Sequence, residues 1–146
     1  MNKICQELGL KNTKFANPHG LPNQMSGSSP EDMATLFGEC LKYELFKTII
    51  KTKEYRCWVE HKGTQHEVIW ENTHKLLRRP NFLGGKTGVT ITAGPCLASC
   101  YEAGSKIFII VLLKTTKLSR RFKETRMILG LALSKLNNKE YRSNIR

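Results

Sequence analysis

The feature that most constrains the fold is a set of three expected β-strands with very little chain between them. Residues 84–92 and 94–101 have the composition of strands, and in the third, residues 106–113, every residue after Lys106 is apolar. A strand without polar alternation is normally buried on both of its faces. The chain must therefore place other elements on both sides of the third strand.

The other elements are expected to be mainly helices. Ser29-Pro30 marks a helix start, because serine caps the first turn and proline suits the first helical position. Apolar residues recur at helical spacing after it. We also expect helical turns over residues 1–9, a short helix over 44–50, a helix after Ser119 and an irregular polar tail over 137–146.

A β-hairpin is expected between the helical part and the three strands. Residues 52–59 and 65–70 are extended candidates on either side of Lys62-Gly63, a pair that favours a tight turn. His61 and His66 lie near this turn. Without further ligand-type residues at suitable spacing, we interpret both as surface histidines.

The positive charge lies in one half of the chain. The net charge is +12; residues 1–72 hold nine basic and nine acidic residues, whereas residues 73–146 hold fifteen basic and three acidic ones. This asymmetry favours either a solvated lysine-rich surface or a basic face for an anionic partner, such as RNA, an acidic protein surface or acidic lipid. Arg120, Arg121 and Lys123 are the candidates for such a face.

The cysteines indicate a reducing environment. Cys5, Cys40, Cys57, Cys96 and Cys100 show no zinc-type spacing. On one extended strand Cys96 and Cys100 would lie about 13 Å apart, too far for a disulfide. We therefore expect free thiols and a reducing intracellular compartment, either the cytosol or an organelle, with no metal and no cofactor.

The chain has no apolar run long enough for a transmembrane helix. Its first residues also lack the apolar core of a secretory signal. We therefore expect neither a membrane span nor a cleaved leader within the chain.

Several segments together resemble one enzyme family. Glu71-Asn72-Thr73-His74-Lys75-Leu76-Leu77 is similar to the Asn-Thr-Asn-x-Leu-Leu segment of the D-alanyl-D-alanine carboxypeptidases, the low-molecular-weight penicillin-binding serine peptidases. Lys86-Thr87-Gly88 resembles the Lys-Thr-Gly of their active-site strand. A lone Lys-Thr-Gly is weak, but the ordered series is specific, and it covers nearly the whole chain. Further matching segments are residues 1–2, 7–13, 15–21, 28–34 and 93–97.

The resemblance implies a fold and a division of the chain. It implies an α+β fold, in which an antiparallel sheet is flanked by helices, as a truncated form of the penicillin-binding-protein and β-lactamase architecture. We expect one partial domain over residues 1–146. Its first part, residues 1–72, is mainly helical and loop, and its second part, residues 73–146, is a basic sheet with a C-terminal helix.

The resemblance also implies roles for three residues. In that family Lys-Thr-Gly binds the terminal carboxylate of the peptide, so Lys86 and Thr87, followed by Gly88, would hold it here. The same strand contributes a backbone N–H to the oxyanion hole.

The family's nucleophile has no counterpart in this chain. There, the serine of Ser-x-x-Lys attacks the peptide carbonyl and Ser-x-Asn relays a proton. None of the eight serines here has Lys three residues later or Asn two residues later. Ser99 has no general base beside it in sequence, and we interpret His19 as a structural loop residue. Loss of a catalytic serine costs on the order of 10⁴–10⁶ in rate, so no complete catalytic set is expected.

Three functional hypotheses follow. The first is a pseudoenzyme that acts as a structural subunit of a larger assembly through its basic half. The second is a split enzyme, in which a separate chain supplies the two serine motifs. The third is an incomplete chain of an ordinary serine-type carboxypeptidase.

A partner is expected at the third strand. In the β-lactamase architecture the last strand lies beside the first, so residues 106–113 would have an open edge. We expect another chain to cover it, by strand addition or by a helix, with Ile107 and Ile109 facing that chain. RNA binding would favour exposed aromatic residues among the basic ones. The pair Tyr141-Arg142 shows this combination and is a further candidate for RNA binding.

Overall fold

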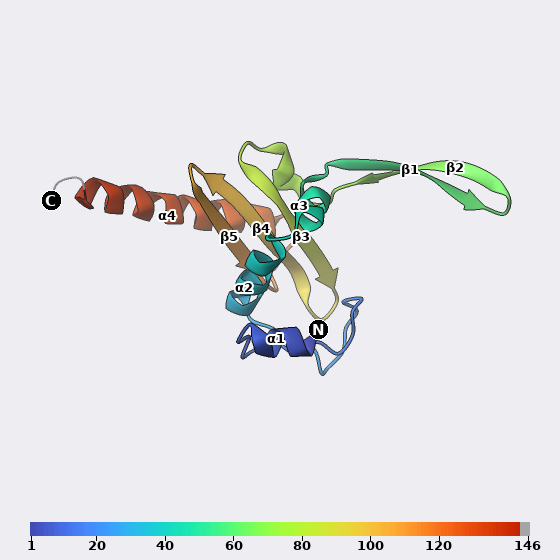
Figure 1. The fold of residues 1–146 in the computed structure, drawn as a ribbon, viewed down its shortest axis with the longest axis horizontal. Helices are drawn as coiled ribbons and strands as arrows, with labels where there is room; N and C mark the ends of the chain where they lie inside the picture. The colour runs from blue at the N-terminus through green and yellow to red at the C-terminus, as the bar shows by residue number, and fades with distance from the viewer. Residues whose placement is uncertain (144–146) are drawn as a thin grey trace.

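The computed structural model describes the backbone of residues 1–143 and the side chains of residues 1–136. Its five strands form a two-stranded and a three-stranded sheet, both antiparallel, so the fold is α+β as expected (Figure 1). The elements in chain order are α1 (Asn2–Glu7), α2 (Pro30–Cys40), α3 (Glu44–Lys51), β1 (Glu54–His61), β2 (Thr64–Glu71), the 3-10 helix η1 (Lys75–Arg78), β3 (Phe82–Thr90), β4 (Gly94–Ala103), β5 (Lys106–Leu112) and α4 (Arg120–Ser143).

The start of α2 ties the N-terminal loop to the rest of the chain. Ser29 caps the helix, with its hydroxyl accepting a hydrogen bond from the Asp32 amide at 3.2 Å. The buried Asp32 carboxylate then accepts hydrogen bonds from the Asn12 amide at 2.8 Å and the Thr13 hydroxyl at 2.7 Å. The first turn of α2 therefore also fixes the loop that follows α1, through the Asp32 carboxylate.

The three-stranded sheet separates two apolar layers. On one face α2 and α3 pack around Phe37 and Ile50, and on the other α4 and η1 pack around Phe122 and Leu76. β5 contributes to both layers, because its side chains alternate between the two faces. Both faces of this strand are packed, as predicted, but burial is only partial: Ile110 is buried, the residues on either side of it are half-buried, and Lys106 and Ile107 are exposed.

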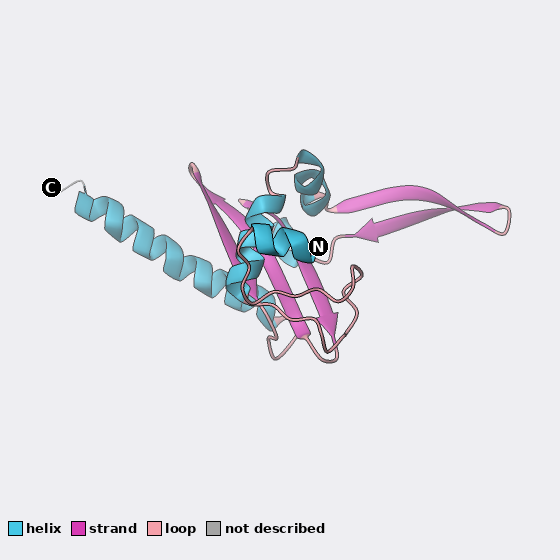
Figure 2. Cartoon of the chain, turned by 60° about the horizontal axis from the view of Figure 1, so that its bottom comes forward, coloured by secondary structure: helices cyan, strands magenta, loops and turns pink. Residues whose placement is uncertain are grey.

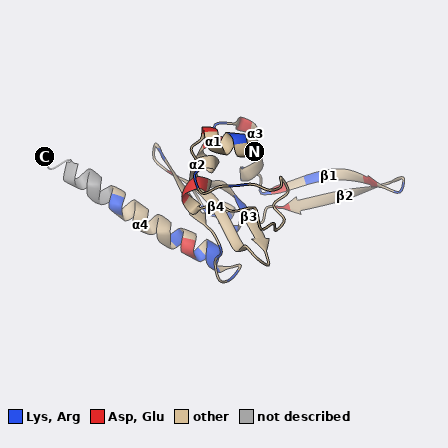
Figure 3. Ribbon diagram, turned by 90° about the horizontal axis from the view of Figure 1, so that it is seen from below, with Lys and Arg blue, Asp and Glu red and all other residues tan. Residues whose placement is uncertain are grey.

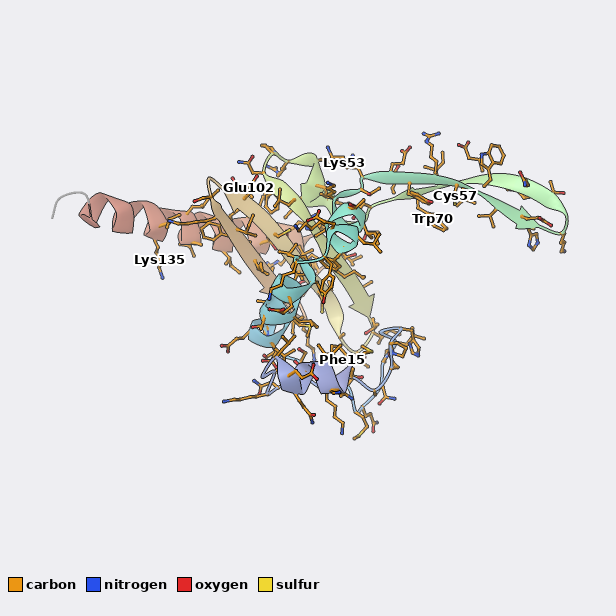
Figure 4. The ribbon with its side chains drawn as sticks, in the orientation of Figure 1. Phe15, Lys53, Cys57, Trp70, Glu102 and Lys135 are labelled. Carbon is orange, nitrogen blue, oxygen red and sulfur yellow. The ribbon has the colours of Figure 1, made fainter. Side chains whose placement is uncertain are left out.

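Two elements extend away from this body on opposite sides. The first part of α4 lies against the sheet and the rest projects beyond it (Figures 1 and 2). The β1–β2 ribbon projects the other way, with Cys57 and Trp70 well away from the sheet (Figure 4). The tight turn expected at Lys62-Gly63 is present, with φ values of 52° and 76° that match a hairpin turn. His61 and His66 are exposed, as expected.

Some boundaries differ from the expected ones. β3 begins at Phe82, two residues early, and α4 continues to Ser143 where an irregular tail was expected from Asn137. Residues 137–143 contain neither glycine nor proline, so nothing in the local sequence stops the helix. All five cysteines are free thiols.

Candidate functional site

The Lys86-Thr87-Gly88 triplet lies within β3, opposite Ala98, Leu97 and Cys96 of β4. Successive side chains of a strand point to opposite faces of the sheet. Thr87 therefore lies on the face that carries η1 and α4, whereas Lys86 lies on the other face and is exposed. The Lys86 ammonium donates a hydrogen bond to the backbone carbonyl of Thr87.

The loop before η1 places a second hydroxyl next to Thr87. The Oγ1 atoms of Thr73 and Thr87 are 2.6 Å apart. Asn72 holds this loop in place, because its Nδ2 donates to the Thr52 carbonyl at 2.9 Å and its Oδ1 accepts from the His74 amide at 2.9 Å. Two threonine hydroxyls from distant parts of the sequence therefore form one hydrogen-bonding pair.

Arg121 of α4 binds the backbone of β3 and β4 at the triplet. Its Nη1 donates to the carbonyl oxygens of Gly88 at 3.1 Å and Cys96 at 3.2 Å, and its guanidinium lies 5.0 Å from the Phe122 ring centroid. Arg121 is only 7% exposed, so it lies against the sheet, and its assignment to a partner-facing surface is wrong. Burial lowers the pKa of the Arg121 guanidinium below its usual range.

A buried His–Ser pair lies next to these residues. The His74 Nε2 and Ser99 Oγ atoms are 2.9 Å apart, and the two residues are 1% and 0% exposed. The fold thus supplies Ser99 with the neighbouring base that the linear sequence did not show. Because both side chains are enclosed, a substrate carbonyl cannot reach Ser99, and the pair does not replace the absent nucleophile.

A cationic cavity of about 1010 Å³ opens beside Thr73. Its lining contains four basic side chains and one acidic side chain, Glu71, which pairs with Arg78 at 3.7 Å. The excess positive charge suits an anionic group. The basic residues are Lys75, Arg78, Lys117 and Arg121.

The family model described as D-alanyl-D-alanine carboxypeptidase (peptidase S11) matches residues 1–116 of this chain. The chain belongs to the D-alanyl-D-alanine carboxypeptidase family. Its similarity to the carboxypeptidase DacF of Bacillus subtilis is 36% identity over 130 residues, which covers 88% of this chain and 33% of DacF. The D-alanyl-D-alanine carboxypeptidase of Streptomyces sp. K15 is 30% identical over 138 residues, covering 91% of this chain and 47% of that protein.

The solved structures agree with the sequence comparison. The crystal structure of the Streptomyces K15 DD-transpeptidase superposes with a TM-score of 0.84 at 29% identity, covering 91% of this chain and 52% of that chain. The resemblance and the partial penicillin-binding-protein fold inferred from the sequence are thereby confirmed. The chain spans between a third and a half of the length of these carboxypeptidase relatives.

The partner-facing candidates do not share one surface. Ile107 is 46% exposed on β5, whereas Ile109 packs against the buried cluster beside α2. Arg120 and Lys123 are exposed at the start of α4, where basic residues gather (Figure 3), and Arg120 approaches Glu124 at 3.9 Å. The side chains of Tyr141-Arg142 lie outside the described residues.

Two negative observations apply to the described part of the chain. None of its helices is both long and apolar enough to span a bilayer. Its side chains form no group of three or more histidine, cysteine or acidic residues suited to a metal ion.

Sequence reasoning missed two residues of this site. His74 could have been found, because it stands where the resembled family segment has asparagine, but nothing around it predicted burial against Ser99. Arg121 was singled out only as part of a basic run. Its contact with β3 joins residues 33 positions apart, which local pattern cannot show.

Proposed function

We propose that this chain supplies one wall of a D-alanyl-D-alanine peptidase site and forms no acyl-enzyme by itself. This carboxylate-binding wall consists of the hydroxyls of Thr73 and Thr87. The observation that carries the proposal is the Thr73–Thr87 hydroxyl pair beside the cationic cavity. A peptide carboxylate needs hydrogen-bond donors and positive charge, and hydroxyl and guanidinium groups supply both. The names of the relatives support a peptide ending in D-alanyl-D-alanine as the ligand.

Cleavage requires a serine from another segment of polypeptide. The 146 residues contain no Ser-x-x-Lys and no Ser-x-Asn, and Ser99 is enclosed. An oxyanion hole and a carboxylate clamp bind a peptide, but acyl transfer needs an attacking group with a base beside it.

The proposed docking surface for that polypeptide includes the outer edge of β5. In the described residues β5 pairs with β4 alone, and a cavity of about 670 Å³ opens beside Ile107. The outward side of α4 also exposes the apolar residues Met127, Ile128 and Leu131. Because this chain covers only 52% of the Streptomyces K15 structure, the proposed occupant is a segment that completes this fold by strand addition and helix packing.

A fluorescent penicillin tests this proposal. We expect the purified chain to fold and to remain unlabelled, because no serine can form the acyl adduct. Labelling is expected to appear when a polypeptide carrying the Ser-x-x-Lys and Ser-x-Asn motifs of a family member is co-expressed with it. An acyl adduct formed by the chain alone would contradict the proposal.

A second candidate is a non-catalytic structural subunit of a larger assembly. The observation that favours it is the exposed basic start of α4, with Arg120, Lys123 and Arg126 on the surface. Such a surface would bind an acidic protein or RNA in a salt-dependent manner. A folded assembly that contains the complementary segment and still resists labelling would favour this candidate.

Thr87→Val is expected to weaken the binding of a peptide ending in D-alanyl-D-alanine by roughly tenfold. The reason is that a hydrogen bond to a charged group contributes about 1.5–3 kcal/mol, and about 1.4 kcal/mol corresponds to a factor of ten. Isothermal titration of the chain with such a peptide measures the change. Thr92→Val, in the turn after β3, is the matched control, and equal affinities of the two variants would refute the role of Thr87.

A further inference from the structure

His74 fills the space beneath the Lys86-Thr87-Gly88 strand. Its ring lies between two aromatic rings, with centroids at 6.4 Å from Phe82 and 6.2 Å from Phe122. Its Nε2 meets the Ser99 hydroxyl at 2.9 Å. The imidazole is thus enclosed by apolar surface except at this one polar contact.

Two connections link His74 to the carboxylate-binding wall. Thr73, the preceding residue, is the hydrogen-bond partner of Thr87. Gly85 precedes Lys86, and a Cβ at this glycine would lie 2.5 Å from the His74 Cδ2 atom. Because the ring touches β3 directly, a displacement of His74 would move both sides of the Thr73–Thr87 contact.

The surroundings of the ring suit a neutral imidazole. The Nδ1 atom is buried and has no hydrogen-bond partner in the described part of the chain. Protonation makes both ring nitrogens donors, and an unpaired buried donor costs about 1–3 kcal/mol, more when charged.

The charges around the ring act in the same direction. Among the described residues the charged group set against it is Arg121 of α4, while β3, β4 and α4 contribute Phe82, Ser99 and Phe122, which are uncharged. Burial is the main cause that lowers the pKa of His74 below its ordinary 6.5. A backbone hydrogen bond at His74 opposes this shift without reversing it, and the Arg121 charge adds to the lowering.

We propose that His74 is a positioning residue, which holds Thr73 and Thr87 in their carboxylate-binding arrangement only while its imidazole is neutral. At acid pH, protonation of His74 then disturbs the arrangement of Thr73 and Thr87, although His74 itself does not contact the ligand. The ligand part of this inference rests on the proposed function, whereas the coupling between His74 and Thr87 does not.

The sign of the effect on folding follows from the lowered pKa. Below pH 6.5 the unfolded chain binds a proton at His74 that the folded chain does not yet bind, so stability is lost as the pH falls through the folded-state pKa. Above pH 6.5 both states are neutral, and His74 adds no pH dependence.

NMR of the isotope-labelled 146-residue chain between pH 7.5 and 4.5 tests the coupling without any ligand. The backbone amides of Thr73, Thr87 and Gly88 are expected to shift with the same midpoint as the His74 ring, below pH 6.5. Amides that stay unchanged while His74 titrates would overturn the proposal. So would a His74 midpoint at or above pH 6.5.

Two variants separate positioning from general stability. His74→Asn restores the residue of the resembled family segment and is expected to fold. In this variant the pH-dependent shift of the Thr87 backbone amide, here called the pH step, is expected to disappear. His66→Asn, on the exposed ribbon, is the matched control and is expected to keep it. A pH step that persists in His74→Asn would overturn the proposal.

Binding of a peptide ending in D-alanyl-D-alanine gives the functional readout. Between pH 7.5 and 5 the affinity of the natural chain is expected to fall about tenfold, which corresponds to the loss of one hydrogen bond to the peptide carboxylate, with no such fall in His74→Asn. An affinity that rises in acid would mean that the imidazolium acts only as an added positive charge, which overturns the proposal. A peptide that binds at neither pH would refute the proposed function, and the amide shifts would still decide the coupling.

Discussion

Gly85→Ala is expected to lower the free energy of unfolding by about 3 kcal/mol or more. The added Cβ would lie 2.5 Å from the His74 Cδ2 atom and closer still to the Ala98 carbonyl oxygen. Neither neighbour can move easily, because the carbonyl belongs to the β4 backbone and the ring is enclosed. Overpacking of this kind costs typically 1–3 kcal/mol and more where backbone must shift, against a total stability of about 5–15 kcal/mol. Urea denaturation followed by circular dichroism measures the loss.

Gly88→Ala on the same strand is the control for this prediction. No atom lies within 4 Å of a Cβ at Gly88, so we expect its unfolding midpoint to stay close to that of the natural chain. If Gly85→Ala unfolded at the same urea concentration as Gly88→Ala, the close packing of His74 beneath β3 would be wrong.

Arg121→Met is expected to lower the free energy of unfolding by about 2–4 kcal/mol. The substitution keeps much of the buried side-chain volume but removes the donor shared by the Gly88 and Cys96 carbonyls, and hydrogen bonds from charged groups contribute about 1.5–3 kcal/mol. Arg121→Lys should restore only part of the loss, because an ammonium lacks the planar fork of a guanidinium. Thermal or urea denaturation of the two variants gives the comparison.

The neighbouring arginine provides a matched control. Arg120 is exposed and its ion pair with Glu124 is 3.9 Å long, so Arg120→Met should change stability by less than about 1 kcal/mol. The same loss in both variants would show that Arg121 acts only through the charge of the helix and not through its contacts with β3 and β4.

Much of the fold was predictable because its signals are local. The Ser29 cap, the turn at Lys62-Gly63 and the apolar run of β5 each depend on residues close in sequence, and all three are present as expected. The end of α4 was not predicted, because a polar composition does not by itself end a helix.

The candidate site was predictable only where the family resemblance named its residues. Lys86, Thr87 and Gly88 lie on β3 as that resemblance implied, and their contact with a carboxylate stays a prediction. The pairing of Thr73 with Thr87 and of His74 with Ser99 joins residues 14 and 25 positions apart. Such pairs follow from how η1 and the sheet pack and have no spacing that marks them in advance.

The amino-acid sequence by itself determined the order of the elements, the one-sided charge and the absence of an acylating serine motif among the 146 residues. These properties depend on composition and on neighbours within a few residues. Only the tertiary structure decided that Arg121 is buried beneath the sheet and that Ile109 and Ile107 differ in exposure. The physical reason is that burial depends on which distant elements cover a residue. The local sequence around a basic or apolar side chain is compatible with a surface position and with an interior one, and tertiary packing decides between them.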